Sequence, residues 1–200
     1  VIRRMGLDEA VRAVCTDTAG SYTVDADNNV LETYRAEDNG GDGYIAEIEV
    51  LRGDFSQVLY NDTEDHVEYV FGDRITELSQ DADGVDVTFA GGAQRRFDLV
   101  IGADGLHSTV RRLTFGEDSR FRRYIGGYLA VYTIPNHLQL HRQMLTYLTP
   151  GKLAATYPVH QTGQAGAAFL FRRHTEFDYD HHDLQQQKWL LREVFAGEGD

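Results

Sequence analysis

The order of apolar and polar residues along the chain predicts more strands than helices. Apolar residues recur at helical spacing in three segments, of which Leu7, Val11 and Val14 form the first. The three predicted helices span 7–15, 51–60 and 184–197. Asp183 precedes the last of them and Gln186 follows three residues later, a pairing typical of a capping box.

Alternating segments separated by turn residues predict the strands. Asn28-Asn29 lies between two such segments and predicts a hairpin, because asparagine tolerates a positive φ. A strand is expected over 44–50 after a loop at 39–43, and four more segments are expected in the β-rich region 66–101. A second β-rich region over 124–171 contains Pro150-Gly151 as a turn and predicts antiparallel strands of a separate sheet.

Residues 98–112, DLVIGADGLHSTVRR, combine a strand, a turn and the start of a helix. The continuous apolar run at 99–101 is typical of a strand covered on both faces in a parallel sheet. Gly102 permits close approach of a backbone or ligand, and Gly105 permits a positive φ. Asp104 follows the strand at its carboxyl end, where ligands bind in α/β sheets. Ser108 is a candidate N-cap, and Arg111 follows it by three residues.

A second junction joins the strand at 44–50 to the helix at 51–60. Arg52 lies at this junction, which predicts a position at the edge of a sheet. Asp54 falls in the first turn of the helix, where a carboxylate suits the helix dipole.

Charge and composition exclude several functions. The net charge of −13 opposes binding to nucleic acid or to an anionic membrane. The chain has no run of 18 apolar residues and no signal-peptide pattern. With Cys15 alone it cannot form an internal disulfide, which fits a cytoplasmic location. Histidines near the C-terminus lack metal-ligand spacing, so no metal site is expected.

Arginines gather in one part of this acidic chain. Residues 98–123 contain five arginines against four acidic residues. Two interpretations remain open for this segment: a site for an anionic ligand, or a solvated surface.

The 98–112 segment resembles the fingerprint of the flavin-dependent aromatic hydroxylases, the FAD-binding monooxygenase family typified by p-hydroxybenzoate hydroxylase and the tetracycline-modifying enzymes. Residues 47–59, EIEVLRGDFSQVL, resemble the family's strand–arginine–helix segment, with Phe55 where leucine is common. Residues 122–159 resemble its substrate-domain sheet, and 188–197 the helix behind that sheet. The family's GxGxxG loop and its later Gly-Asp motif are not in this sequence, so we expect a central part of a longer enzyme.

The resemblance implies an α/β fold in which a partial FAD-binding domain, 1–119, precedes an antiparallel β-sheet substrate domain, 120–200. It implies that Asp104, with Gly102, Gly105 and Arg111 shaping its turn, supports FAD and NAD(P)H binding. It implies that Arg52 approaches the flavin. No residue is identified as a catalytic acid or base, because in this family the flavin carries the chemistry and the protein supplies orientation and electrostatics.

The implied activity is hydroxylation of an aromatic or polyketide-like small molecule. Two alternatives remain open: a non-catalytic substrate-domain fragment that exposes apolar surface and forms a homo-oligomer, or a flavin-dependent reductase or halogenase. Four tyrosines of the second β-rich region could line an aromatic-substrate pocket or simply pack in the core: Tyr128, Tyr132, Tyr147 and Tyr157.

Overall fold

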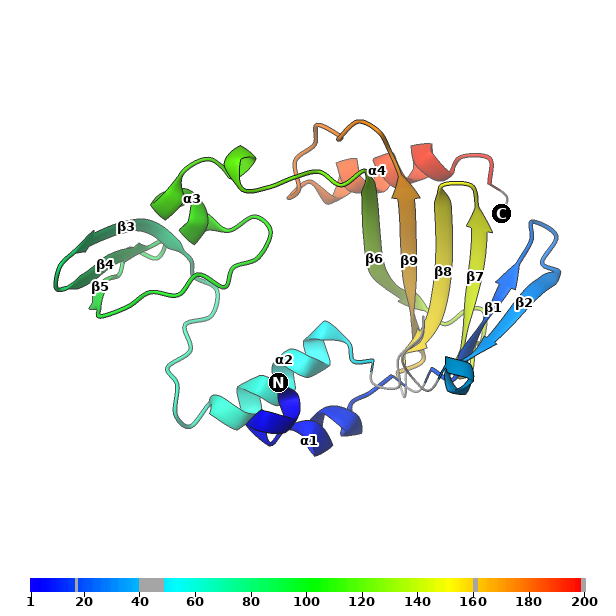
Figure 1. Cartoon of the computed structure of the whole chain (residues 1–200), viewed down its shortest axis with the longest axis horizontal. Helices are drawn as coiled ribbons and strands as arrows, with labels where there is room; N and C mark the ends of the chain where they lie inside the picture. The colour runs from blue at the N-terminus through cyan, green and yellow to red at the C-terminus, as the bar shows by residue number, and fades with distance from the viewer. Residues whose placement is uncertain (17, 40–48, 160–161, 199–200) are drawn as a thin grey trace. The chain divides into compact units, whose positions relative to one another are not determined.

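The computed structural model describes residues 1–16, 18–39, 49–159 and 162–198. The chain forms two compact units (Figure 1). The first combines Val1–Asp62 with Gly126–Asp200, and the second is Thr63–Ile125. Among the described residues, no helix has both the length and the hydropathy needed to cross a bilayer.

A six-stranded sheet forms the centre of the first unit. In spatial order its strands are β2 (Val30–Arg35), β1 (Gly20–Val24), β7 (Gln143–Thr149), β8 (Lys152–Val159), β9 (Gln164–Arg172) and β6 (Gly127–Pro135). Strand β1 pairs with β7 in parallel, and the other neighbours pair antiparallel. The antiparallel pairing predicted for the strands of 124–171 is confirmed. Their sheet is not separate, because β1 adds to it in parallel through a long-range pairing that no local pattern encodes.

Turn residues fall where the sequence predicts them. Asn28 adopts a φ of 61° between β1 and β2, and Gly151 adopts a φ of 82° between β7 and β8. The Asp25 carboxylate accepts hydrogen bonds from the backbone N–H groups of Asp27 and Asn29, which closes the first hairpin. Both predicted hairpin turns are confirmed.

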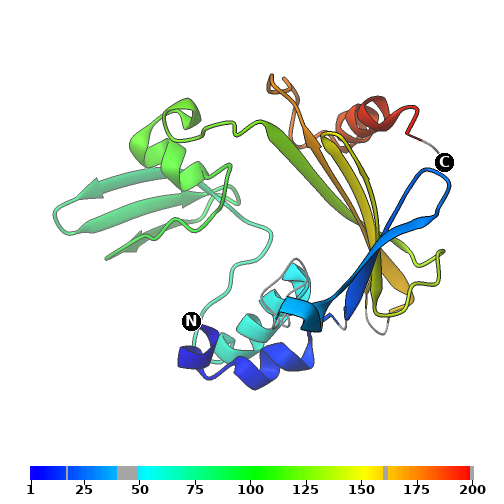
Figure 2. The same cartoon turned by 45° about the vertical axis from the view of Figure 1, so that its right-hand side comes forward.

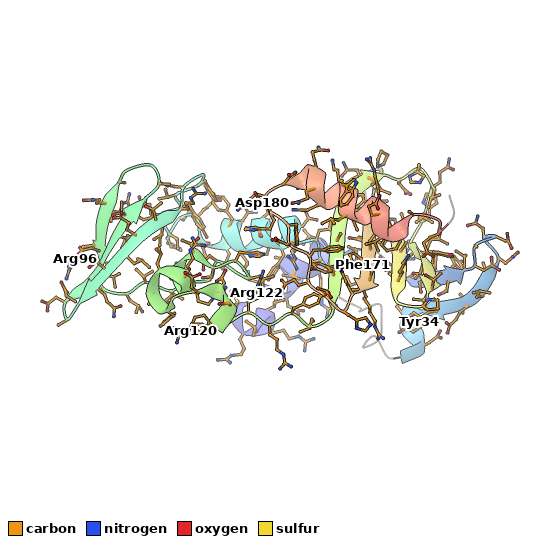
Figure 3. The ribbon with its side chains drawn as sticks, turned by 90° about the horizontal axis from the view of Figure 1, so that it is seen from above. Tyr34, Arg96, Arg120, Arg122, Phe171 and Asp180 are labelled. Carbon is orange, nitrogen blue, oxygen red and sulfur yellow. The ribbon has the colours of Figure 1, made fainter. Side chains whose placement is uncertain are left out.

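Helix α4 (Leu184–Phe195) covers one face of the sheet (Figure 1). The Phe195 ring packs against Phe169 and Phe171 of β9, with ring centroids 4.9 and 6.0 Å away. Figure 3 labels Phe171 on the sheet beside this helix. Lys152 of β8 donates a hydrogen bond to Glu198 just after the helix. These ring contacts and the hydrogen bond all involve residues on one face of the sheet, which is the face against which α4 packs.

The opposite face carries a row of leucines across four neighbouring strands. Leu129 pairs with Leu170, Leu170 with Leu153, and Leu153 with Leu148. We call this side of the sheet the leucine face. Leu129, Leu148 and Leu170 are 66%, 58% and 46% exposed, so the row is an apolar surface rather than core.

Two α-helices of the first unit, α1 (Asp8–Ala13) and α2 (Arg52–Thr63), lie side by side (Figures 1 and 2). Leu7 and Val11 are buried, as the helical spacing predicts. Short 3-10 helices span Ile2–Met5 (η1) and Ala36–Asn39 (η2). Of the strand predicted over 44–50, residues 44–48 lie outside the described residues, and Val50 forms an isolated antiparallel bridge with Cys15.

The second unit contains an antiparallel sheet in the order β3 (Ile75–Asp81), β4 (Gly84–Phe89), β5 (Gln94–Phe97). Helix α3 (Thr109–Phe115) and the 3-10 helix η3 (Asp118–Arg120) follow. The predicted strand at 66–71 was wrong. Glu68 instead forms an ion pair with Arg95 of β5, so side chains rather than a backbone ladder attach this segment.

The apolar run at 99–101 also differs from its prediction as a strand covered on both faces. Strand β5 ends at Phe97, and Leu99 and Ile101 are 73% and 80% exposed. Among the described residues no strand pairs with this run. Its residues favour strands, but a strand forms only where a neighbour supplies hydrogen bonds and packing.

The compact units do not follow the predicted boundary at 119/120, because the β1–β2 hairpin joins the same sheet as β6–β9. The assignment of FAD and substrate roles to 1–119 and 120–200 stays a prediction. The α/β class is confirmed.

Candidate functional site

Gly102 lies where the chain after β5 comes closest to α3. A Cβ at this position would be 2.8 Å from Cγ1 of Val110, closer than side-chain atoms pack. Only glycine therefore lets α3 approach the backbone here. The neighbour is the Val110 side chain rather than the backbone or ligand that the sequence predicts, and contact of Gly102 with a ligand stays a prediction.

Asp104 binds the first turn of α3 with both carboxylate oxygens. Oδ1 accepts from the Ser108 hydroxyl, and Oδ2 accepts from the Val110 N–H at 3.0 Å. Ser108 is buried and is the N-cap of α3, because its Oγ also accepts from the Arg111 N–H at 2.9 Å. Ser108 therefore accepts a hydrogen bond from the helix backbone and donates one to Asp104, which links the start of α3 to the turn.

The environment of Asp104 favours its charged form. Burial opposes ionisation, but the hydrogen bonds from Ser108 and from the Val110 N–H outweigh it, so the pKa of Asp104 lies below its ordinary value. At neutral pH the carboxylate is ionised and accepts these bonds.

Arg111 ties the turn to the segment after α3. Its Nη2 donates to the Leu106 carbonyl at 2.7 Å and to Asp118 Oδ1 at 2.7 Å. This contact with Arg111 lowers the pKa of Asp118. Arg111 therefore holds the turn in place, as the resemblance implies, and Asp118 is the partner that the sequence did not identify.

The backbone at the tip of the turn is open to a ligand. Gly105 adopts a φ of 79°, and a Cβ there would meet nothing within 4 Å. The N–H groups of Gly105 and Leu106 form no hydrogen bond within the described part of the chain. Residues 101–106 are exposed, so these two donors face solvent.

A cavity of about 580 Å³, lined mostly by apolar residues but also by Ser108 and Arg111, adjoins the turn. Strands β3 and β4, the run 99–102 and α3 all line it. Leu78, Val85, Val100 and Val110 are among its walls.

Arg52 is the first residue of α2 and is exposed. It belongs to the first unit, whereas Gly102, Asp104, Gly105 and Arg111 lie together in the second. The backbone next to Arg52 is anchored, because the Thr16 N–H donates to the Glu49 carbonyl at 2.7 Å.

The arginine-rich segment is partly engaged within the protein. Arg111 pairs with Asp118, and Arg120 lies over the Phe121 ring at 5.7 Å and donates to the Phe115 carbonyl. Figure 3 labels Arg120 and Arg122 in this segment. These contacts explain part of the charge cluster without an anionic ligand.

Relatives in sequence are named as flavin enzymes or uncharacterised. No protein-family model matches the chain. Over its whole length it is 39% identical to an uncharacterised protein, Rv1260, of Mycobacterium tuberculosis, and the match covers 54% of that protein. It is 33% identical to a flavin-dependent monooxygenase of Legionella longbeachae, again over 100% of this chain and 50% of the relative.

Solved structures share the fold of this chain. The tetracycline destructase Tet(51) superposes with a TM-score of 0.82 at 28% identity, over 100% of this chain and 50% of that one. Klebsiella pneumoniae HpxO, solved with FAD and uric acid, superposes with a TM-score of 0.62 at 24% identity over 98% of this chain and 50% of that one, and shares the fold. The chain spans about half the length of the relatives it matches.

Proposed function

Because the chain belongs to the flavin-dependent monooxygenase family, we propose that the complete protein is an FAD-dependent monooxygenase that consumes NAD(P)H and O₂ to hydroxylate an aromatic or polyketide-like molecule. The name of Tet(51) supports the polyketide-like class, because tetracyclines are fused-ring molecules rich in phenol and carbonyl oxygens. The single cysteine, Cys15, supports a cytoplasmic location.

The observation that carries FAD binding is the open tip of the 102–106 turn. The backbone N–H groups of Gly105 and Leu106 have no partner among the described residues and face solvent. Backbone donors at such an exposed turn suit an anionic group such as the pyrophosphate of a dinucleotide. Asp104 and Arg111 do not need to touch the cofactor in this arrangement, because their side chains hold the turn that presents those donors.

Arg52 and the leucine face also have roles in this proposal. Exposed Arg52 would supply positive charge near the flavin, and the leucine face would bind the apolar rings of the substrate. When bound, FAD supplies the redox chemistry and activates O₂, and the residues here orient the substrate and exclude water.

The test uses the complete protein, purified with its flavin. We expect FAD in stoichiometric amount, substrate-stimulated NAD(P)H oxidation, and incorporation of one ¹⁸O atom from ¹⁸O₂ into the product of tetracycline or of a phenol panel. Arg52→Ala should slow this oxidation, whereas Arg35→Ala, which removes an exposed arginine of β2, should not.

Three results would contradict the proposal. Purified protein without FAD would exclude a flavoenzyme. NAD(P)H oxidation with no ¹⁸O in any product would instead indicate a reductase. A product that carries halide rather than oxygen would indicate a halogenase.

A further inference from the structure

The sheet separates four tyrosines that the sequence could not distinguish. The register pairs Tyr128 with Phe171 of β9 and places Tyr132 and Tyr147 on the same side, which α4 covers. The Tyr128 ring stacks on Phe171, and the Tyr132 ring on Phe169. Tyr157, at an odd position of β8, lies on the leucine face.

The Tyr157 side chain lies against a glycine of the neighbouring strand β9. Gly166 of β9 pairs directly with it. A Cβ on Gly166 would be 2.1 Å from Cζ of Tyr157 and 2.4 Å from its hydroxyl oxygen. The phenol end of the ring therefore rests on the Gly166 backbone, a position that only glycine leaves open.

The hydroxyl of Tyr157 is a donor that has no acceptor within the described parts of the chain. Burial, and next the negative charge of Glu49, raise the pKa of Tyr157, so the hydroxyl keeps its proton at neutral pH. Glu49 lies three residues before Arg52, the residue proposed to approach the flavin.

Between Tyr157 and the leucine row lies a row of smaller side chains. Val131 pairs with Ala168, Ala168 with Ala155, and Ala155 with Thr146. Four residues along a strand separate the Tyr157 row from the leucine row, about 13 Å at the usual rise of a strand. Val131 is 54% exposed and Ala168 is partly exposed, whereas Ala155 and Thr146 are buried. The open part of this row is therefore apolar and lies over β6 and β9.

We propose that Tyr157, held flat by Gly166, is a positioning residue that donates a hydrogen bond to an oxygen on one edge of a planar, fused-ring substrate. The rings of that substrate lie over Ala168 and Val131 and end against the leucine row. This inference rests on the proposed function and adds the residue that fixes the orientation of the substrate.

Equilibrium binding to the complete flavin-loaded protein tests it with two probes, 1,8-dihydroxyanthraquinone and anthracene, which lacks oxygen. Tyr157→Phe should raise the Kd of the oxygenated probe about fivefold, the loss of one neutral hydrogen bond, and leave the Kd of anthracene unchanged. Gly166→Ala should raise both Kd values, because its methyl group displaces the ring from the sheet. Tyr132→Phe, which alters the face that α4 covers, should change neither.

The outcomes separate this inference from the proposed function. FAD content and O₂-dependent NAD(P)H consumption of the wild type report on the function alone. Equal Kd values of wild type and Tyr157→Phe for the oxygenated probe would overturn the inference, as would a wild-type protein that binds neither probe. Retained FAD in both the Tyr157→Phe and Gly166→Ala variants would show that altered binding does not come from loss of the fold.

Discussion

Replacing Asp104 with alanine removes the acceptor of two hydrogen bonds at the start of α3. The Ser108 hydroxyl and the Val110 N–H would each lose their partner. Hydrogen bonds to charged groups contribute about 1.5–3 kcal/mol each when buried, but Asp104 is exposed and solvent screens both. Loss of a side-chain acceptor at a helix N-terminus typically costs about 1 kcal/mol. We therefore expect Asp104→Ala to lower the local stability of α3 by about 1–2 kcal/mol.

Amide hydrogen exchange measures this loss at the residues concerned. At about 1.4 kcal/mol per factor of ten, the Val110 and Arg111 amides should exchange about 5- to 30-fold faster in Asp104→Ala. Asp104→Asn keeps an oxygen for the Val110 N–H and should show a smaller increase. Amides of β8, in the other unit, provide an internal control.

A double-mutant cycle with Ser108→Ala decides whether the two side chains act together. Because both substitutions remove the bond between Asp104 and Ser108, the double variant should lose less stability than the sum of the single variants. Strictly additive losses, or unchanged exchange in Asp104→Ala, would refute the conclusion that Asp104 and Ser108 together stabilise the start of α3.

The pH dependence has a defined sign. Since the pKa of Asp104 is lowered in the folded protein, its stabilisation of α3 is complete above the ordinary value of 3.8. It is lost as the pH falls from there through the lower folded pKa. Asp104→Asn should lose this part of the acid dependence of exchange.

Three further predictions concern other positions. Gly102→Ala should destabilise α3 by about 1–3 kcal/mol through its clash with Val110, and Val110→Ala in the same chain should recover much of that loss in thermal unfolding. Thr146 is buried and its hydroxyl has no partner among the described residues, so Thr146→Val should leave the melting temperature unchanged or higher, whereas a drop as large as that of Thr146→Ala would contradict this. The hydrogen bond from Lys152 lowers the pKa of Glu198, so the docking of α4 should weaken as the pH falls below 4.5; fluorescence of Trp189, the only tryptophan, should report this in wild type and not in Glu198→Gln.

Local chemistry made the turn predictable from sequence. Gly102, Gly105 and Ser108 have roles that depend on neighbours within eight residues, and all three occupy the expected conformations. Asp118 was missed as the partner of Arg111 because the path of the chain after α3 is not encoded in a local pattern.

Strands were less predictable because a strand needs a neighbour as well as a propensity. The 99–101 run is apolar and β-branched in part, yet it has no ladder among the described residues. Tyr157 is a second example of a feature that depends on a neighbouring strand. Its separation from three similar tyrosines depends on the register of β8 against β9, which periodicity within one strand cannot supply.

The parallel pairing of β1 with β7 sets an order of events in folding. Gly20 pairs with Gln143, so the middle of the sheet cannot close until more than 120 residues beyond β1 have emerged from the ribosome. The unit Thr63–Ile125 is one continuous stretch of sequence, and along the chain it separates the two segments that form the other unit. Its local hairpins can form first during synthesis, while β1 and β2 wait as an isolated hairpin, which is only marginally stable in water. Slow synthesis between residues 35 and 143 would therefore prolong the exposure of that hairpin and favour aggregation.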